Sequence, residues 1–281
     1  MQAASIGSKL ILITGCNKGV GYGILKNLAA RPDNHSFIMA VRSSERGKKA
    51  LDELEKQIPK LNERTTIQEL DISKTESIDN FVKWIKDSCK KIDCLISNAG
   101  TAFKGDIFNE EVVRVTFQTN FYGTVDLIEK MLPYVADSGK IITITSSTGK
   151  LAKLKSEELK KKFDDPKITR EEVFALAKQF YDNVVDETYE SKGWPRQGYA
   201  MSKLCLNIYT RIFGRNPEVT KRDIQVYGCC PGWVRTDMAG PNATRSIEEG
   251  SVCPCDLVYF PWKINPELQG QFFYDSKVTP L

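Results

Sequence analysis

The sequence predicts an α/β protein built on a single doubly wound parallel sheet with helices on both faces. Short apolar, β-rich segments alternate with segments of helical periodicity over the first two thirds of the chain. This alternation is typical of β-α-β units, whose parallel strands are buried on both faces and joined by helices. No internal repeat or linker-like segment interrupts it, so we expect residues 1–281 to form one domain.

The apolar segments are predicted to be buried strands because each is short and rich in β-branched or other apolar residues. They are residues 10–13, 37–41, 66–70, 94–97, 141–145 and 224–229, with a final strand near 271–273. Between them, apolar residues recur at intervals of three and four, which predicts amphipathic helices. These helices are residues 21–30, 45–58, 77–89, 112–132 and 199–213, with another near 246–259.

Two segments depart from the alternation. Residues 150–195 are strongly charged, with apolar positions such as Val173, Phe180 and Val184 at helical spacing, which predicts a helical insertion packed on the domain. Residues 232–262 follow the sixth strand and contain many Gly, Pro and Cys residues. Irregular backbone of this kind often closes over a substrate, so we expect this segment on the substrate side of a site.

Composition limits the partners of the chain. The 40 basic and 36 acidic residues give a net charge of +4, which does not indicate nucleic acid or an anionic membrane surface. Residues 1–5 lack the features of a signal peptide, and no apolar run approaches the ~18 residues that span a bilayer. The eight cysteines have no framework spacing, and Cys253 and Cys255 lack a second pair for zinc. We therefore expect a reduced, cytoplasmic protein without a metal.

A glycine-rich loop follows the first predicted strand. Its three glycines allow a tight turn, close approach of the backbone to a pyrophosphate and close packing of the next helix, whose N-terminus faces the phosphates. Because the loop lies in the first strand-to-helix turn of an alternating chain, it predicts a Rossmann-type dinucleotide site. The residues expected to hold the phosphates are Gly15, Asn17, Lys18, Gly19, Val20 and Gly21.

The end of the second predicted strand favours NADP(H) over NAD(H). An acidic residue there would bind the adenosine ribose of NAD and repel a 2'-phosphate. The chain instead has Arg42 after Val41, with no carboxylate at this point of the sequence. The guanidinium of Arg42 suits a phosphate, and Lys18 could add a second positive charge from the first loop.

Several further motifs follow in order along the chain, which resembles the short-chain dehydrogenase/reductase family over essentially its whole length. The motifs are Asp71, the segment Asn98-Ala99-Gly100, Asn120, Ser146, the pair Tyr199 and Lys203, and Pro231-Gly232. The resemblance implies that Asp71 contacts the adenine side of the cofactor and that Asn98, Ala99 and Gly100 support it. The other cofactor contacts that it implies are Ile72, Pro231, Gly232, Val234, Thr236, Asp237 and Met238. Ser97 stands where the family usually has a second Asn, and we expect it to substitute structurally.

Within the family, the chain is similar to the monomeric NADPH-dependent carbonyl reductases of the human type. The likeness rests on residues 229–241, on Gly193-Trp194-Pro195 and on the long gap between Ser146 and Tyr199. In those reductases the extra helices shield the surface through which other members form tetramers. The resemblance therefore implies a monomer that reduces ketones, aldehydes or quinones to alcohols.

Tyr199 and Lys203 are the candidates for the proton donor and the group that tunes it. A carbonyl oxygen that gains charge as hydride arrives needs a proton. An isolated Tyr has a pKa of ~10. Lys203 lies one helical turn beyond Tyr199 on the same face, so we expect its charge to lower the pKa of Tyr199. The resemblance implies that Lys203 also binds the nicotinamide ribose.

Ser146 and Asn120 complete the candidate tetrad. We expect the hydroxyl of Ser146 to hold the substrate oxygen, with Ser147 as the rival for this role. Asn120 resembles the family residue that holds a water linking Lys203 to solvent. The alternative is that its amide caps a local backbone group.

The substrate side is predicted from side chains near these motifs. Phe103, Trp233 and Met238 could line an apolar cleft for aromatic or long-chain carbonyl compounds, and core packing is the alternative. Ser147 and Thr148 stand where the human-type reductases have larger apolar side chains, which predicts a wider or more polar pocket. Cys230 falls where that group has a reactive cysteine, so glutathione conjugates are possible substrates, and a plain buried cysteine is the alternative.

Three other functions are compatible with parts of this pattern. An alcohol, steroid or retinoid dehydrogenase working oxidatively would share every catalytic residue. A non-catalytic NADP-sensing protein is expected to have lost part of the tetrad, whereas all four positions are filled. Sugar-nucleotide epimerases also use a Tyr and a Lys at this spacing, but with a different glycine spacing and a larger C-terminal domain.

Overall fold

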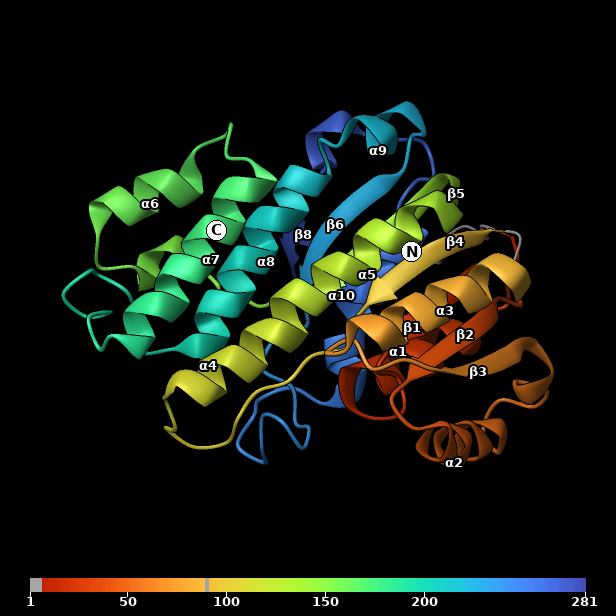
Figure 1. Cartoon of the computed structure of the whole chain (residues 1–281). Helices are drawn as coiled ribbons and strands as arrows, with labels where there is room; N and C mark the ends of the chain where they lie inside the picture. The colour runs from red at the N-terminus through yellow and green to blue at the C-terminus, as the bar shows by residue number, and fades with distance from the viewer. Residues whose placement is uncertain (1–6, 89–90) are drawn as a thin grey trace.

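The computed structural model describes residues 7–88 and 91–281. Its strands form one eight-stranded sheet in the order β3-β2-β1-β4-β5-β6-β7-β8 (Figure 1). All neighbouring strands pair in parallel except β7 and β8, which confirms the predicted doubly wound sheet. The strands are β1 (Leu10–Thr14), β2 (Ser36–Val41), β3 (Thr65–Glu69), β4 (Ile92–Ser97), β5 (Val135–Ile144), β6 (Gln225–Cys230), β7 (Phe272–Tyr274) and β8 (Lys277–Val278).

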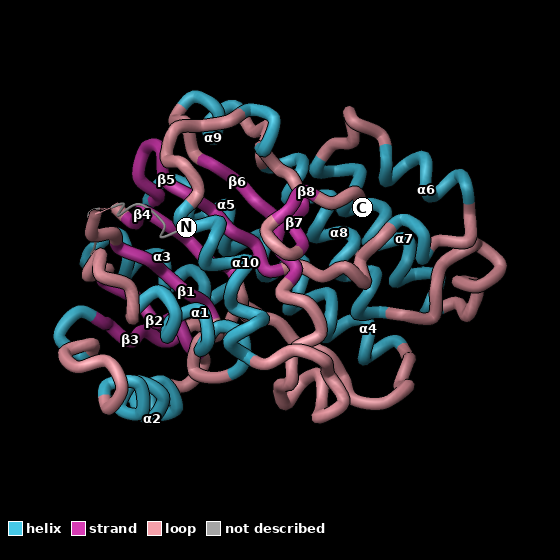
Figure 2. The backbone as a smooth tube through the Cα atoms, turned by 180° about the vertical axis from the view of Figure 1, so that it is seen from behind, coloured by secondary structure: helices cyan, strands magenta, loops and turns pink. Residues whose placement is uncertain are grey.

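Helices cover both faces of the sheet. One face carries α3 (Thr75–Ser88), α4 (Glu110–Phe117), α5 (Thr124–Met131) and α8 (Gly198–Phe213), seen in front of the sheet in Figure 1. The other face carries α1 (Gly19–Ala29), α2 (Ser44–Glu55) and α10 (Ile247–Tyr259), seen from behind in Figure 2. Within the described ranges, no helix is long and apolar enough to cross a bilayer.

The predicted segments correspond to these elements with shifted ends and three corrections. The strand predicted over 141–145 begins at Val135, because the polar stretch before Lys140 hides the first pairing of Val135 with Ile92. The helix predicted over 112–132 is divided into α4 and α5 by a π-helical segment, Gln118–Gly123, which apolar spacing does not distinguish from α-helix. The short elements α9 (Pro217–Lys221) and β8 were not predicted. Residues 1–5 and the predicted helix end at Cys89 lie outside the described residues.

The predicted helical insertion contains α6 (Glu157–Asp164) and α7 (Arg170–Val185). Figure 1 shows α7 beside α8 and α6 on the outer side of α7. Phe163, Phe180 and Trp194 are buried in the same apolar cluster as Met201 of α8, and the indole of Trp194 donates a hydrogen bond to Asn183 Oδ1 at 2.9 Å. The insertion therefore packs on the helix that carries Tyr199 and Lys203.

Gly123 allows the π-helical segment to lie close to the backbone that follows β3. Gly123 ends the π-helical segment, and a Cβ added there would overlap the carbonyl oxygen of Ile72 and lie 2.9 Å from that of Gln118. Both atoms are backbone and cannot rotate away. The helix therefore approaches the end of β3 only because residue 123 has no side chain.

We predict that Gly123→Ala lowers the free energy of unfolding by about 2–3 kcal/mol, since the new methyl group forces the backbone of Ile72 aside. The matched control is Gly228→Ala in β6, where the nearest atoms would lie at an ordinary 3.7 Å. That change should cost less than about 1 kcal/mol. Urea unfolding followed by circular dichroism measures both, and equal midpoints for the two variants would contradict the prediction.

Candidate active site

The carboxyl ends of β1 and β4 are tied together by side-chain hydrogen bonds. The hydroxyl of Thr14 accepts from the backbone N–H groups of Asn98 and Ala99, each at 2.9 Å. The amide of Asn98 donates in return to the carbonyl oxygen of Thr14 at 2.8 Å. The strand order reverses between these two strands, and ligands of doubly wound sheets bind at such a point.

The glycine loop has the shape expected for binding phosphate. Gly15 and Gly19 have φ values of +65° and +61°, and a Cβ at Gly21 would lie 2.5 Å from Asn98 Nδ2. Unlike α2, α7 and α10, helix α1 has no side-chain N-cap, so the N–H groups of its first turn are not satisfied by a capping side chain. The loop thus fits a dinucleotide pyrophosphate, which would supply the missing acceptors.

The charges at the end of β2 differ from those expected. Arg42 is exposed directly after β2, but Glu69 ends the neighbouring strand and accepts a hydrogen bond from the N–H of Ser44 at 3.1 Å. No carboxylate follows β2 in the sequence, but the neighbouring strand places one beside its end. In the register of β2 and β3, Val41 is paired with Glu69. Knowledge of this strand pairing would have been needed to predict the carboxylate at the end of β2.

Lys18 is paired with Asp237, which the sequence did not predict. Their side chains meet at 2.7 Å between the loops after β1 and β6, and the ammonium lowers the pKa of the carboxyl. Both side chains are well exposed, at 63% and 78%, so the pair is weak and Lys18 can turn to another anion. Both remain candidates for cofactor contacts.

The remaining cofactor candidates lie along the same edge. Asp71 Oδ1 accepts from the N–H and hydroxyl of Ser73, which fixes the turn after β3, and Ile72 is buried beside it. Thr236 lies against Gly19, because a Cβ on that glycine would lie 3.2 Å from the Thr236 methyl group. Val234 is buried. The candidate cofactor residues thus lie on the loops after β1, β3, β4 and β6.

Lys203 is a buried cation that joins α8 to the end of β5. Its side chain donates to the carbonyl oxygen of Ile144 at 2.9 Å, and burial lowers its pKa to about 8. Gly100 lies against it, since a Cβ there would lie 3.7 Å from the Lys203 ammonium. Four residues earlier on the same helix, the ring centroid of Tyr199 lies 5.9 Å from the ammonium.

Burial, and not the lysine, controls the acidity of Tyr199. Burial raises the pKa of Tyr199 to about 12, and a hydrogen bond with Ser146 opposes that rise. The pKa of Tyr199 is therefore raised and not lowered as expected, because desolvation of the phenolate dominates. Tyr199 is protonated at neutral pH and can act as a proton donor.

Ser146, and not its rival Ser147, contacts the tyrosine. The Ser146 hydroxyl lies 2.9 Å from that of Thr148 and accepts from the Thr148 N–H at 3.1 Å. Asn207 was not predicted as a site residue. Its amide donates to the carbonyl oxygens of Ser146 and Gly149 at 3.3 and 2.9 Å. Its position four residues after Lys203, on the same helix face, was the available signal.

The side chain of Asn120 holds the segment after β4. Its Oδ1 accepts from the Thr101 N–H at 2.7 Å, and its amide donates to the Thr101 carbonyl at 2.8 Å and to Ser202 Oγ at 3.2 Å. The backbone-capping alternative is therefore confirmed for this side chain. A water held near Asn120 and linking Lys203 to solvent stays a prediction.

Ser97 does not replace the bonds of an asparagine. It is buried at the end of β4, and its hydroxyl has no hydrogen-bond partner among the described residues. The hydrogen bonds at this strand end are made by Asn98 and Thr14. Ser97 thus fills space without taking part in the network.

The apolar candidates for the substrate side are exposed on loops. Phe103, Trp233 and Met238 are 43%, 53% and 42% exposed, so the alternative of core packing is wrong for all three. Ile107, which the sequence analysis missed, is 57% exposed on the loop of Phe103. The loops after β4 and β6 lie near one another, since the positive charge of Lys104 helps to lower the pKa of the Asp237 carboxyl. Exposed apolar side chains gathered near a polar site are typical of a binding surface.

Cys230 lies beneath this surface. It is buried, and its sulfur accepts a hydrogen bond from the N–H of Gly232 at 3.4 Å. It contributes to raising the pKa of both Tyr199 and Lys203. Gly232 follows Pro231 with a φ of +83°, which favours glycine. The cysteine is close to the candidate catalytic groups, as expected, but it is enclosed.

Comparisons with known proteins agree with this geometry. Residues 9–156 match the family model described as short chain dehydrogenase. Carbonyl reductase (NADPH) 1 of Mus musculus is 35% identical over 281 residues, covering 96% of this chain and 97% of that protein. The Homo sapiens protein of the same name is 35% identical over 282 residues, covering 98% and 99%. The structure of salutaridine reductase from Papaver somniferum superposes with a TM-score of 0.83 at 25% identity, covering 95% of this chain and 99% of that one.

The raised pKa of Tyr199 is testable by comparing the phenolate absorbance of the wild-type protein with that of Tyr199→Phe during titration. We predict no difference between the two curves from about pH 7 to about pH 10, because the Tyr199 phenolate forms only near pH 12. The other tyrosines cancel in the subtraction. A step of one phenolate in this range would instead show that Lys203 lowers the pKa.

Proposed function

Because the chain belongs to the short-chain dehydrogenase family, we propose that it is an NADPH-dependent carbonyl reductase that converts ketones, aldehydes or quinones to alcohols. The observation that carries this proposal is the placement of Tyr199, whose pKa desolvation raises, beside the hydroxyl of Ser146. A protonated phenol is the form that a reductase needs at neutral pH. The 35% identity to proteins named as NADPH carbonyl reductases over nearly the full chain supports the same reaction and cofactor.

The chain's own residues would hold NADPH along the carboxyl edge of the sheet. The N–H groups of the glycine loop would face the pyrophosphate, Arg42 and Lys18 the 2'-phosphate, and Lys203 the nicotinamide ribose. Pro231, Gly232, Val234 and Thr236 would border the nicotinamide. When bound, NADPH supplies the hydride.

The protein's part in the reaction is to bind and protonate the carbonyl oxygen. The hydroxyl of Ser146, fixed by Thr148, donates to this oxygen, and Tyr199 transfers its proton to it. Lys203 adds a fixed positive charge at the same edge, held by the Ile144 carbonyl. Asn120 holds the backbone of Thr101 in place beside the lysine.

The same features argue against the competing functions. A protonated Tyr199 is the form that donates a proton to a carbonyl oxygen, and the raised pKa favours this form at neutral pH. An NADP sensor without catalysis has no use for a converging tetrad. We therefore favour reduction.

The substrate is a small carbonyl compound with an apolar body. Phe103, Trp233 and Met238 offer exposed apolar surface, while Thr148 beside Ser146 offers a polar one. This combination suits aromatic or long-chain substrates that carry a second polar group. Glutathione conjugates belong to this class, although the enclosed Cys230 offers them no direct contact.

The protein acts as a monomer in the cytoplasm under this proposal. Every residue from 200 to 210 of α8 is buried, and α7 packs against it, so this helix offers little free surface to a second copy. The seven described cysteines are all free, which suits a reducing compartment.

The role of Tyr199 predicts that Tyr199→Phe lowers kcat by roughly 10²- to 10⁴-fold, the usual contribution of a general acid. The affinity for NADPH should change by less than about threefold, because the phenol contacts the substrate. The control is Tyr181→Phe, which removes an exposed hydroxyl bonded to Glu110. Steady-state reduction of a quinone and of an aromatic aldehyde measures kcat, and NADPH fluorescence measures binding. More than a tenth of the wild-type kcat in Tyr199→Phe would overturn the assigned role.

The role of Arg42 predicts that Arg42→Asp raises the KM for NADPH by roughly 10- to 100-fold, the effect of losing a charged hydrogen bond of about 1.5–3 kcal/mol. The KM for NADH should change by less than about threefold. Arg46→Asp makes the same change of charge at an exposed position of α2 and should affect neither cofactor strongly. Equal losses for both cofactors in Arg42→Asp would contradict the assignment.

A further inference from the structure

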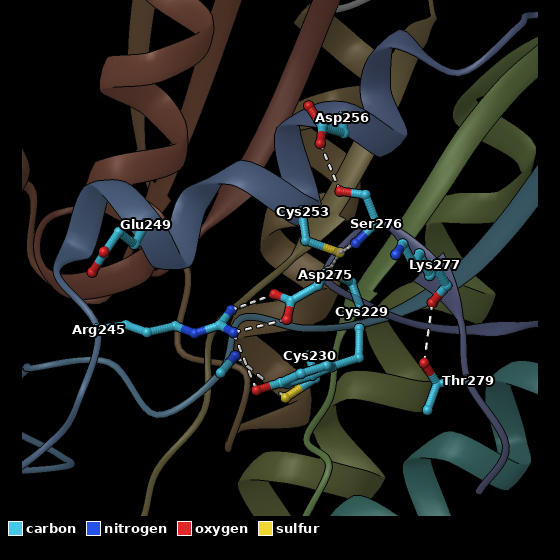
Figure 3. A network of polar contacts seen from close by, with 12 residues as sticks. Cys229, Cys230, Arg245, Glu249, Cys253, Asp256, Asp275, Ser276, Lys277 and Thr279 are labelled. Atoms are coloured by element: carbon cyan, nitrogen blue, oxygen red, sulfur yellow. Dashed lines mark hydrogen bonds and ion pairs between the residues drawn. The ribbon is translucent and has the colours of Figure 1, made fainter.

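Two buried thiols meet between β6 and α10, outside the catalytic groups. The sulfur atoms of Cys229 and Cys253 lie 3.2 Å apart, and the Cys229 S–H donates to Cys253. Cys229 is fully buried and Cys253 is 3% exposed. Figure 3 shows the pair beside the turn between β7 and β8. The thiols are already in contact, and closing to a disulfide bond of about 2.05 Å requires a shift of only about 1 Å.

The surroundings make the two thiols chemically unequal. The backbone N–H of Ser276 donates to the Cys253 sulfur at 3.3 Å. The hydrogen bonds from Cys229 and Ser276 lower the pKa of Cys253, whereas burial raises that of Cys229 well above its ordinary value. Cys253 is thus the thiol that forms a thiolate, and Cys229 is placed to react with it after oxidation.

The turn between β7 and β8 lies against Cys253. Asp275 and Ser276 both have positive φ values, of 51° and 58°. The turn is fastened by polar contacts, in which Arg245 binds Asp275 at 2.6 and 2.9 Å and Ser276 Oγ donates to Asp256 at 2.6 Å (Figure 3). A two-strand edge held by polar contacts opens more readily than the core of the sheet.

We propose that Cys229 and Cys253 are a redox-active pair that closes to a reversible disulfide when the protein meets hydrogen peroxide. The Cys253 thiolate attacks one peroxide oxygen, the O–O bond breaks, and the departing hydroxide takes a proton to become water, leaving a sulfenic acid on Cys253. The Cys229 sulfur then attacks the Cys253 sulfur, the S–OH bond breaks, and the hydroxide leaves as water with the Cys229 proton. In sum, two thiols are oxidised and one peroxide is reduced to two waters.

The disulfide alters the segment that borders the proposed nicotinamide site. Cys229 directly precedes Cys230, Pro231 and Gly232 at the end of β6. Helix α10 also touches this segment, because a Cβ on Gly250 would overlap the side chain of Val234. Drawing β6 and α10 together therefore displaces the Pro231-Gly232 turn and lowers turnover. This effect on turnover rests on the proposed function, whereas formation of the disulfide does not.

The pair is tested by treating the full-length protein with hydrogen peroxide and mapping disulfides by mass spectrometry of non-reduced peptides. We expect a Cys229–Cys253 crosslink that dithiothreitol reverses and that is absent in Cys253→Ser. The matched control is Cys255→Ser on the same helix, whose sulfur faces the Ile24 carbonyl at 3.8 Å, and this variant should still crosslink. Thermal unfolding of each reduced variant checks its fold. A disulfide between Cys229 and Cys230, or oxidation of Cys253 without a crosslink, would overturn the proposal.

Turnover is measured on the same samples before and after peroxide. The wild-type protein should lose at least about half of its carbonyl reductase activity and regain it with dithiothreitol, while Cys253→Ser keeps its activity. A crosslink that leaves turnover unchanged would overturn the effect on the site. No turnover in the untreated protein would contradict the proposed function alone, because the crosslink is read by mass.

Discussion

The buried ammonium of Lys203 constrains the geometry of the whole site. A charge removed from water is tolerated only where polar atoms replace the solvent, and the carbonyl oxygen of Ile144 at the end of β5 provides this contact. Helix α8 must therefore lie close to that strand end. A Cβ on Gly149 would lie 2.5 Å from the backbone nitrogen of Leu204, so the loop after β5 can approach the helix only with glycine at this position. Gly100 in the loop after β4 also lies beside the ammonium, since a Cβ there would lie 3.7 Å from it.

The position of α8 then determines what Tyr199 can do. Desolvation of the phenol on this helix raises its pKa, which keeps the proton on the oxygen at neutral pH. Two amides hold the loops around it, with Asn120 bonded to Thr101 after β4 and Asn207 to Ser146 and Gly149 after β5. Neither amide needs to touch a substrate. Their hydrogen bonds fix the two loops between which a carbonyl oxygen would be bound.

The sequence predicted those parts of the molecule that depend on local pattern and chain order. Alternating apolar segments gave the sheet, and the motif spacing indicated Tyr199, Lys203 and Ser146. It could not predict quantities that depend on distant neighbours. The acidity of Tyr199 is set by burial, and the carboxylate of Glu69 reaches the end of β2 only through the pairing of β2 with β3. Cys229 and Cys253 meet only because α10 packs on β6.

The loop after β6 joins all of these parts through contacts of unequal strength. Its first residues are fixed, because Val234 is buried against α10 and Gly232 is enclosed by the side chain of Arg245. Its next residues are held by the exposed pair of Asp237 with Lys18, which water and salt weaken. The loop can therefore release Lys18 to a phosphate without disturbing the Pro231-Gly232 turn. Movement of α10 has the opposite consequence, since it acts on the fixed part of the loop and so on the groups that we propose to border the nicotinamide.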